Sequence, residues 1–158
     1  NGRVTSYDLR SDQAQQALKN IAPLIPEGHS LVVKEGDIYQ GVDETDVDRL
    51  VLDVPEPWRV VDSAPNLLVP GGIFISFLPT VLQVHRLTEE LESHGGFQLI
   101  ESVELMLRPW HVSERSMRPV HRMVAHTGFI TTARLCSPRP KGTTRITRLE
   151  SSSKMGSK

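Results

Sequence analysis

The sequence predicts a mixed α/β domain built on an open, mostly parallel sheet. Short apolar runs of strand length alternate with helical patterns, which is typical of parallel strands joined by right-handed crossovers. Residues 73–78 (IFISFL) are almost entirely apolar, as expected of a strand that is covered on both faces. Residues 97–107 and 128–135 have strand patterns with no helix between them, so we expect them to form an antiparallel pair at the edge of the sheet.

The expected strands are residues 3–7, 30–34, 49–52, 73–78, 97–107 and 128–135, and the expected helices are residues 12–20, 60–68 and 81–93. Ser11 is placed to cap the first helix, and Thr80 opens the third. The third helix should end at Gly95, because glycine readily adopts the left-handed conformation that closes a helix. The acidic stretch 42–48 predicts a surface loop, and Pro70-Gly71-Gly72 predicts a turn.

Length and composition place the chain among single globular domains: 158 residues, 38% hydrophobic and 23% charged. No apolar run approaches the roughly 18 residues of a membrane span. The start at Asn1 has no signal-peptide pattern and no Met, and such an abrupt start indicates a piece of a longer protein. With a single cysteine in the chain, a cytoplasmic location fits best. Cys136 is the single cysteine, which excludes a disulfide and a cysteine-built metal site. Residues 1–136 are the expected folded domain, and the Ser/Lys/Arg-rich residues 137–158 the expected disordered tail.

Charge is divided unevenly along the chain. Residues 1–100 carry 7 Lys/Arg and 15 Asp/Glu, whereas residues 101–158 carry 11 and 4. This split indicates either a half of the chain that faces a polyanion or a basic tail beside ordinary solvated faces.

Within residues 108–127 the basic and aromatic residues are Arg108, Trp110, His111, Arg115, Arg118, His121, Arg122 and His126, with Glu114 as the single acid. Such a segment suits an RNA backbone and an unstacked base, or alternatively an oligomer contact; its histidines lack metal-site spacing.

Three acids, Asp8, Asp37 and Asp53, stand just past the ends of successive expected strands. In an open α/β sheet the carboxyl ends of the strands form the ligand-binding edge. A carboxylate there can accept from the two hydroxyls of a ribose or from the amino group of a nucleobase. Each acid alone is better explained by a surface turn or a cap, but three in register favour a rim that binds a cofactor.

Three segments, residues 2–10 (GRVTSYDLR), 52–58 (LDVPEPW) and 117–129 (MRPVHRMVAHTGF), resemble the tRNA N1-adenine methyltransferases that modify the T-loop adenosine at position 58. The resemblance implies a Rossmann-like sheet that binds S-adenosyl-L-methionine, tRNA as substrate, and a cytoplasmic homotetramer. It implies that Asp8 holds the cofactor ribose, that Asp37 meets the adenine, and that Gln13 faces the cofactor. Gln13 is equally well explained as an exposed helix residue.

The resemblance assigns the catalytic role to Asp53, between the methionine end of the cofactor and the target base. A carboxylate that accepts from the exocyclic amino group would orient the adenine and raise the electron density at N1. Pro55 and Trp58 would form one wall of the pocket for the flipped base, although Trp58 also fits a core aromatic that caps the sheet. The residues expected to face RNA are Arg115, Arg118, Arg122 and His126, the last with a structural role as its alternative.

The chain departs from the family pattern in one respect. The two adjacent glycine pairs, at residues 71–72 and 95–96, are turn signals, so the Gly-rich cofactor loop and the strand before it are expected to be missing. In the family that strand lies beside the one ending in Asp53, and its loss would expose two edges and leave the isolated chain inactive. Two alternatives stay open: a methyltransferase of this fold with another substrate, and a non-catalytic RNA-binding or partner-docking fragment.

Overall fold

The computed structural model describes residues 2–123 and 126–136. Its elements, in order, are β1 (Arg3–Asp8), α1 (Ser11–Ile21), η1 (Ala22–Leu24), β2 (Ser30–Glu35), η2 (Ile38–Gln40), β3 (Val47–Leu52), η3 (Pro57–Val60), α2 (Ala64–Leu67), β4 (Leu68–Leu78), α3 (Val81–His94), β5 (Phe97–Glu104), β6 (Trp110–Ser113), β7 (Ser116–Pro119) and β8 (Phe129–Leu135). None of the helices in these two ranges is long and apolar enough to cross a membrane. The tail expected at residues 137–158 lies outside the described residues.

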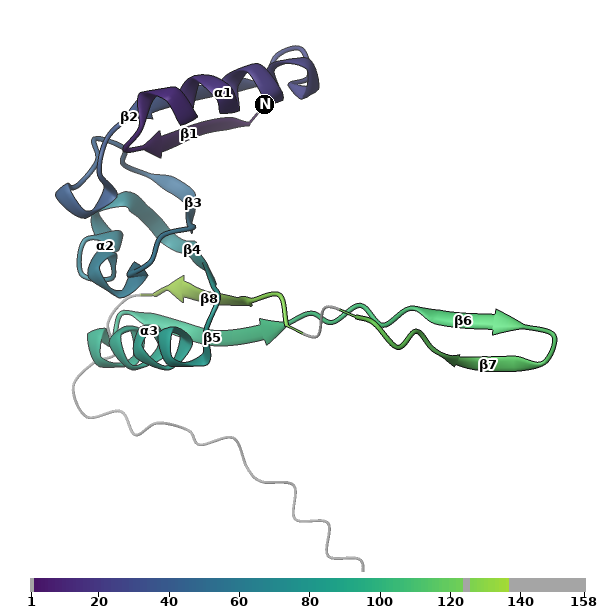
Figure 1. Ribbon diagram of the computed structural model, residues 1–158. Helices are drawn as coiled ribbons and strands as arrows, with labels where there is room; N and C mark the ends of the chain where they lie inside the picture. The colour runs from purple at the N-terminus through teal and green to yellow at the C-terminus, as the bar shows by residue number, and fades with distance from the viewer. Residues whose placement is uncertain (1, 124–125, 137–158) are drawn as a thin grey trace, which may run out of the picture.

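The strands form two α/β units and a separate hairpin. β1 pairs in parallel with β2, and the four-stranded sheet has the order β3-β4-β8-β5, with β3 parallel to β4 and β8 antiparallel to both neighbours. Figure 1 shows β1, β2 and α1 as a unit set apart from the larger sheet, and β6 and β7 as a long arm that projects away from it. The mixed α/β architecture predicted from the sequence is therefore confirmed.

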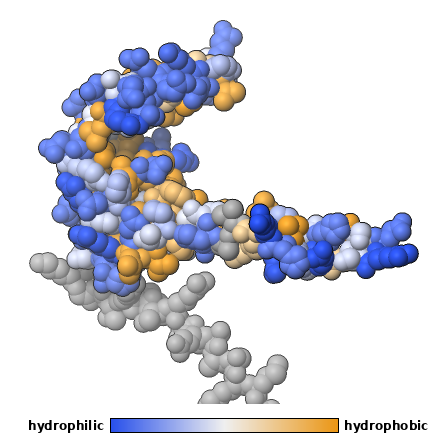
Figure 2. Space-filling view, in the orientation of Figure 1, coloured by the Kyte–Doolittle hydropathy of each residue, from blue (hydrophilic) through white to orange (hydrophobic). Residues whose placement is uncertain are grey.

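The sheet is interrupted between β1 and β3, where the sequence predicted a missing strand. Val4 on β1 is 58% exposed and Val51 on β3 is 67% exposed. Figure 2 shows hydrophobic surface along the hollow between the two units. Each of these strands thus presents an unpaired edge with exposed apolar side chains, a combination that folded proteins normally cover.

The hydrophobic core lies between the four-stranded sheet and α3. Leu87 and Leu91, one turn apart on α3, are fully buried, and the rings of Phe74 and Phe97 meet edge to face at 5.8 Å between centroids. α3 has the ends that its sequence predicts, since Thr80 caps it and Gly95 closes it with φ of 73°. The β1–β2 unit is thinly packed by comparison, because Ala14 is the one buried hydrophobic side chain among its described residues. Most of the buried hydrophobic side chains of the described residues therefore belong to the larger sheet and the helices packed on it.

Three expectations for the first half of the chain are wrong. Ser11 is the first residue of α1 rather than its cap, and the N-cap position is Arg10, whose carbonyl accepts from the Ala14 amide and whose side chain makes no capping bond. The helix expected at residues 60–68 is only η3 and the four-residue α2, because Pro65 lacks an amide proton and its ring clashes with a preceding carbonyl in a longer helix. The predicted turn at residues 70–72 lies within β4, as a bulge in the pairing with β3.

The end of the sheet also differs from expectation. β5 stops at Glu104 rather than at residue 107. The expected antiparallel pairing is confirmed, since β5 pairs with β8 at one edge of the sheet and β8 also pairs with β4. The segment expected as a basic insertion forms the β6–β7 hairpin, in which Trp110 pairs with Pro119 and Val112 with Met117. Neither short strand has a long apolar run, so the local pattern did not reveal them.

Candidate active site

The three predicted acids lie at the carboxyl ends of their strands. Asp8 is the last residue of β1 and pairs in register with Glu35, so Asp37, two residues further on, follows β2 at the same edge. Asp53 comes directly after β3, next to the carboxyl end of β4. Asp8 and Asp37 therefore belong to one unit and Asp53 to the other. No strand pairing joins the two units in the described part of the chain.

Asp8 and Asp37 each use one carboxylate oxygen to hold their own turn. Asp8 Oδ1 accepts from the Arg10 amide at 2.8 Å, and Asp37 Oδ1 accepts from the Tyr39 amide at 2.9 Å. The turn and cap interpretations are thus correct for both residues. They do not exclude ligand binding, because the second oxygen of each carboxylate is left to accept from another donor.

Asp53 is exposed, and within residues 2–123 and 126–136 its carboxylate has no hydrogen-bond or ion-pair partner. The loop that follows it is nevertheless fixed. Gln83 Nε2 donates to the Pro55 carbonyl at 3.0 Å, and the Glu56 amide donates to Tyr39 Oη at 3.0 Å. A free carboxylate on a firmly held loop is suited to binding something that the chain itself does not supply.

Trp58 fits its alternative interpretation as a core aromatic. It packs against the hydrophobic core, its Nε1 is buried without a partner among the described residues, and the Arg86 guanidinium lies 4.3 Å from a ring centroid. Pro55, by contrast, is exposed beside Asp53. Pro55 is therefore better placed than the indole to border a pocket at Asp53.

A polar cluster at the ends of β1 and β2 links them to the loop before β3. Glu44 accepts from Tyr7 Oη and from Lys34 Nζ, the latter at 2.7 Å, and Lys34 also donates to Tyr7 Oη at 3.2 Å. Burial and the hydrogen bond to Glu44 raise the pKa of Tyr7. The hydrogen bond between Lys34 and Glu44 raises the pKa of Lys34 and lowers that of Glu44. The cluster thus holds the segment that contains Asp37 in place.

His126 lies between the ends of β4 and β5. Its Nδ1 is 2.8 Å from Glu104 Oε1, its Nε2 is 2.6 Å from the Pro79 carbonyl, and its ring is 5.3 Å from that of Phe129. Both ring nitrogens face acceptors, so the doubly protonated imidazolium satisfies both. The Glu104 carboxylate and then the Pro79 carbonyl raise the pKa of His126. These contacts fit the structural role that was the alternative interpretation of His126.

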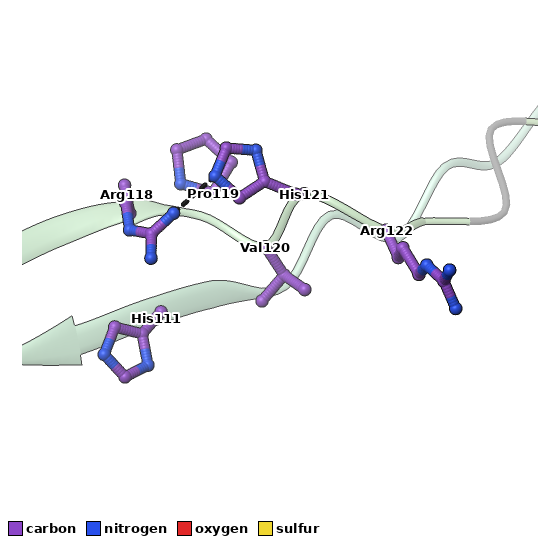
Figure 3. Close-up of a pocket in the computed structure, with 6 residues that line it drawn as sticks. All are labelled: His111, Arg118, Pro119, Val120, His121 and Arg122. Atoms are coloured by element: carbon purple, nitrogen blue, oxygen red, sulfur yellow. Dashed lines mark hydrogen bonds between the residues drawn. The ribbon is translucent and has the colours of Figure 1, made fainter.

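The β6–β7 arm has two chemically different faces. Cross-strand partners share a face, so Trp110, Val112 and Met117 stand together, 55%, 65% and 72% exposed, while His111 and Arg118 stand on the other side. Figure 3 shows the residues around a shallow pocket near the base of the arm: His111, Arg118, Pro119, Val120, His121 and Arg122. Arg118 bonds to the His121 ring there. The polar face is basic, and the opposite face is apolar.

The family described as tRNA methyltransferase complex GCD14 subunit matches residues 1–127. This chain belongs to that family. The relative from Methanocaldococcus jannaschii named tRNA (adenine(57)-N(1)/adenine(58)-N(1))-methyltransferase TrmI is 34% identical, over 88% of this chain and 57% of the relative. A Thermus thermophilus protein named tRNA (adenine(58)-N(1))-methyltransferase TrmI is 29% identical, over 84% of this chain and 52% of the relative.

A solved structure described as a SAM-dependent O-methyltransferase from Thermotoga maritima is 37% identical, with a TM-score of 0.79 over 89% of this chain and 52% of that one. The GCD14-family chain therefore has the fold of these methyltransferases and spans about half the length of the curated relatives it matches. The resemblance stated from the sequence is confirmed. No cluster of three or more potential metal ligands occurs in the described part of the chain.

In this GCD14-family member the structure joins the Asp37 and Asp53 loops but leaves Gln13 exposed on α1. Sequence reasoning missed two residues that hold these loops, Tyr39 and Gln83. Thr80 and Gln83 have the T-x-x-Q spacing of a capping box, a signal that could have drawn attention to Gln83. Tyr39 carries no such local signal, because its partner Glu56 is 17 residues away.

Proposed function

We propose that this chain is part of the catalytic domain of an S-adenosyl-L-methionine-dependent tRNA (adenine-N1)-methyltransferase. The observation that carries the proposal is Asp53, an exposed carboxylate without a partner in the described residues, at the end of β3 on a loop held from two sides. Two relatives that cover most of the chain are named tRNA (adenine-N1)-methyltransferases. The catalytic segment is residues 1–136, with residues 137–158 as a basic tail.

The donor set at β1 and β2 fits the proposed cofactor. Asp8 and Asp37 each keep an oxygen free, and carboxylates suit the ribose hydroxyls and the adenine amino group. Gln13, exposed on α1, is the third residue assigned to this side. When bound, S-adenosyl-L-methionine supplies a methyl group that its sulfonium has already activated for transfer.

Asp53 acts on the target adenine. Its carboxylate accepts a hydrogen bond from the exocyclic amino group, which orients the ring and raises the electron density at N1. A bound S-adenosyl-L-methionine would supply the methyl group to the lone pair of N1, and its sulfur would keep the electrons of the broken carbon–sulfur bond. The ring becomes positively charged, and the carboxylate stabilises that charge. No residue has to remove a proton from N1 before the attack.

The remaining assigned residues either contact the RNA or support the rim of the site. The target base must leave its stack to reach Asp53, and Pro55 borders its path, with Trp58 supporting the loop from the core. Arg115, Arg118 and Arg122 belong to the arm and its base, where they can contact phosphates. His126 holds the rim together from below. A tRNA is the substrate that fits a basic arm together with a site for a single flipped base.

The apolar face of the arm supports self-association. Trp110, Val112 and Met117 form an exposed row on a projecting hairpin, and a second copy of the chain can cover such a row symmetrically. We assign a homotetramer, following the family resemblance, and place the enzyme in the cytoplasm. The open edges of β1 and β3 fit one further strand, which a longer parent protein would contribute together with the Gly-rich loop. The isolated chain is then inactive.

Methyl transfer by the complete parent protein tests the proposal. Nucleoside mass spectrometry of a tRNA transcript should find N1-methyladenosine at one T-loop adenosine, and Asp53→Asn should lower kcat at least about a hundredfold. Filter binding should find tRNA affinity little changed. The name of the Thermotoga structure raises O-methylation as the rival activity. Ribose-methylated nucleosides, or full turnover by Asp53→Asn, would contradict the proposal.

A further inference from the structure

The relative position of the Asp37 and Asp53 loops is not set by strand pairing, because β1 and β2 form a unit separate from β3. Tyr39 connects the two loops directly. Its amide donates to Asp37 Oδ1 at 2.9 Å, and its hydroxyl accepts from the Glu56 amide at 3.0 Å. Tyr39 thus contacts Asp37, the carboxylate assigned to the methyl donor. It also contacts the loop that carries Asp53, the carboxylate assigned to the acceptor base.

The Tyr39 side chain is itself held in place. It packs against the hydrophobic core, and the Arg59 guanidinium lies 4.1 Å from its ring centroid. Arg59 also bonds to the Glu56 carboxylate at 3.1 Å. Because the ring is fixed on one face by a cation and packs on the core, its hydroxyl meets the Glu56 amide in a defined position.

A second side chain holds the same peptide unit from the other side. Gln83 Nε2 donates to the Pro55 carbonyl at 3.0 Å, and its Oε1 accepts from Thr80 Oγ1 at 2.7 Å. Thr80 Oγ1 in turn accepts from the Gln83 amide at 3.3 Å, so the start of α3 anchors this side chain. The Pro55 carbonyl and the Glu56 amide proton belong to one peptide bond. In a trans peptide these two groups point in opposite directions.

We propose that Tyr39 and Gln83 are positioning residues that clamp the Pro55–Glu56 peptide from opposite sides and set where Asp53 stands relative to Asp37. The inference rests on the proposed function. Methyl transfer between two bound reactants requires that they be held close and oriented, so the cofactor side and the base side of the site must keep a defined separation. No strand pairing joins β1 and β2 to β3, so the side chains of this clamp connect the Asp37 loop to the Asp53 loop.

Kinetics of the complete parent protein separate positioning from binding. Tyr39→Phe keeps the ring, the core packing and the contact with Arg59 but removes the acceptor for Glu56. Gln83→Met keeps the length of the side chain and removes the donor for Pro55. Each variant should lower kcat for methyl transfer roughly tenfold and change KM for tRNA and for cofactor less than about twofold. Ser63→Ala is the matched control, since it removes a hydroxyl bond to the Val60 carbonyl that involves neither Tyr39, Gln83 nor the Pro55–Glu56 peptide.

Amide hydrogen exchange gives a second readout that does not depend on turnover. The Glu56 amide should lose protection in Tyr39→Phe and keep it in Ser63→Ala. If the unsubstituted protein methylates tRNA and Tyr39→Phe has the same kcat, the inference fails while the proposed function stands. If the unsubstituted protein transfers no methyl group to tRNA, the proposed function fails and the inference fails with it. A fall in melting temperature equal to that of the control, with kcat unchanged, would show a purely structural role.

Discussion

Glu104 and His126 form an ion pair across the ends of two strands, with 2.8 Å between Glu104 Oε1 and His126 Nδ1. The Pro79 carbonyl accepts at the other ring nitrogen, 2.6 Å from Nε2. The contact therefore joins the end of β5, the residue after β4 and the segment that leads into β8. It ties together the carboxyl ends of β4 and β5, which lie on the same side of the sheet as the carboxyl end of β3 before Asp53.

This ion pair predicts a pH-dependent stability. The folded pKa of His126 is raised above its ordinary value of 6.5, so its stabilisation is fully present below that value and is lost as pH rises through the folded pKa. In urea unfolding, the His126→Asn variant should therefore have a clearly lower free energy of unfolding than the unsubstituted chain at pH 5.5. At pH 8.5 the difference in free energy should be smaller. His85→Asn is the control, because that histidine pairs with Glu89 at 3.3 Å on an exposed helix face. An equal loss at both pH values would exclude the charged pair.

Gly36 predicts how tightly the Asp37 loop is held. A Cβ at this position would lie 2.9 Å from Cδ1 of Tyr7, and the Tyr7 ring cannot easily move, because its hydroxyl is bonded to Glu44 and Lys34. Gly36→Ala should therefore destabilise the chain by about 1–3 kcal/mol in urea unfolding. Gly2→Ala, where a Cβ would meet nothing within 4 Å, should have no such effect. Equal stability of the two variants would mean that the Tyr7 cluster is loose.

The same substitution should weaken the cofactor site. Displacing Gly36 moves the adjacent Asp37, so calorimetric titration of the complete parent protein with S-adenosylhomocysteine should find a higher Kd for Gly36→Ala. Tyr39→Phe is the informative comparison, because it leaves the Asp37 cap intact and should leave this Kd unchanged. Unaltered affinity in Gly36→Ala would remove Asp37 from the proposed site.

The basic face of the arm predicts salt-dependent RNA affinity. Removing one phosphate contact should reduce the slope of log K against log salt by about 0.7–0.9. Titration of a tRNA transcript over a range of salt should show this reduction for Arg118→Ala and for Arg122→Ala. Lys19→Ala removes a cation from α1, away from the arm, and should leave the slope unchanged. Slopes equal to that of the unsubstituted protein would favour the oligomer interpretation for the whole arm.

The apolar face predicts a loss of self-association. Trp110→Ser combined with Met117→Ser removes two side chains that are 55% and 72% exposed in the single chain. Light scattering after gel filtration should find a smaller assembly for this variant. The matched control is His111→Ser, which lies next to Trp110 on β6 but on the opposite face of the arm. An unchanged mass for the double variant would show that copies associate elsewhere.

Much of the fold could be predicted because its signals are local. The run at residues 73–78 lies within β4, Thr80 and Gly95 bound α3, and β1, β2 and β3 lie within a few residues of their expected limits. These features depend on apolar periodicity and on the conformational preferences of single residues. Errors arose where neighbours competed locally. The Ala14 amide bonds to the Arg10 carbonyl and so extends α1 to include Ser11, and Pro65 broke the expected helix at residues 60–68.

The positions of the three acids at strand ends could be predicted from the sequence, since Asp8, Asp37 and Asp53 each follow a short apolar run. The connection between the Asp37 and Asp53 loops, by contrast, depends on the folded structure. Tyr39 reaches Glu56 over 17 residues, and Gln83 reaches Pro55 over 28. Both bonds depend on how η2, α3 and the loop after β3 pack on the same core. Packing between distant segments is a property of the whole fold, so no local pattern along the chain encodes it.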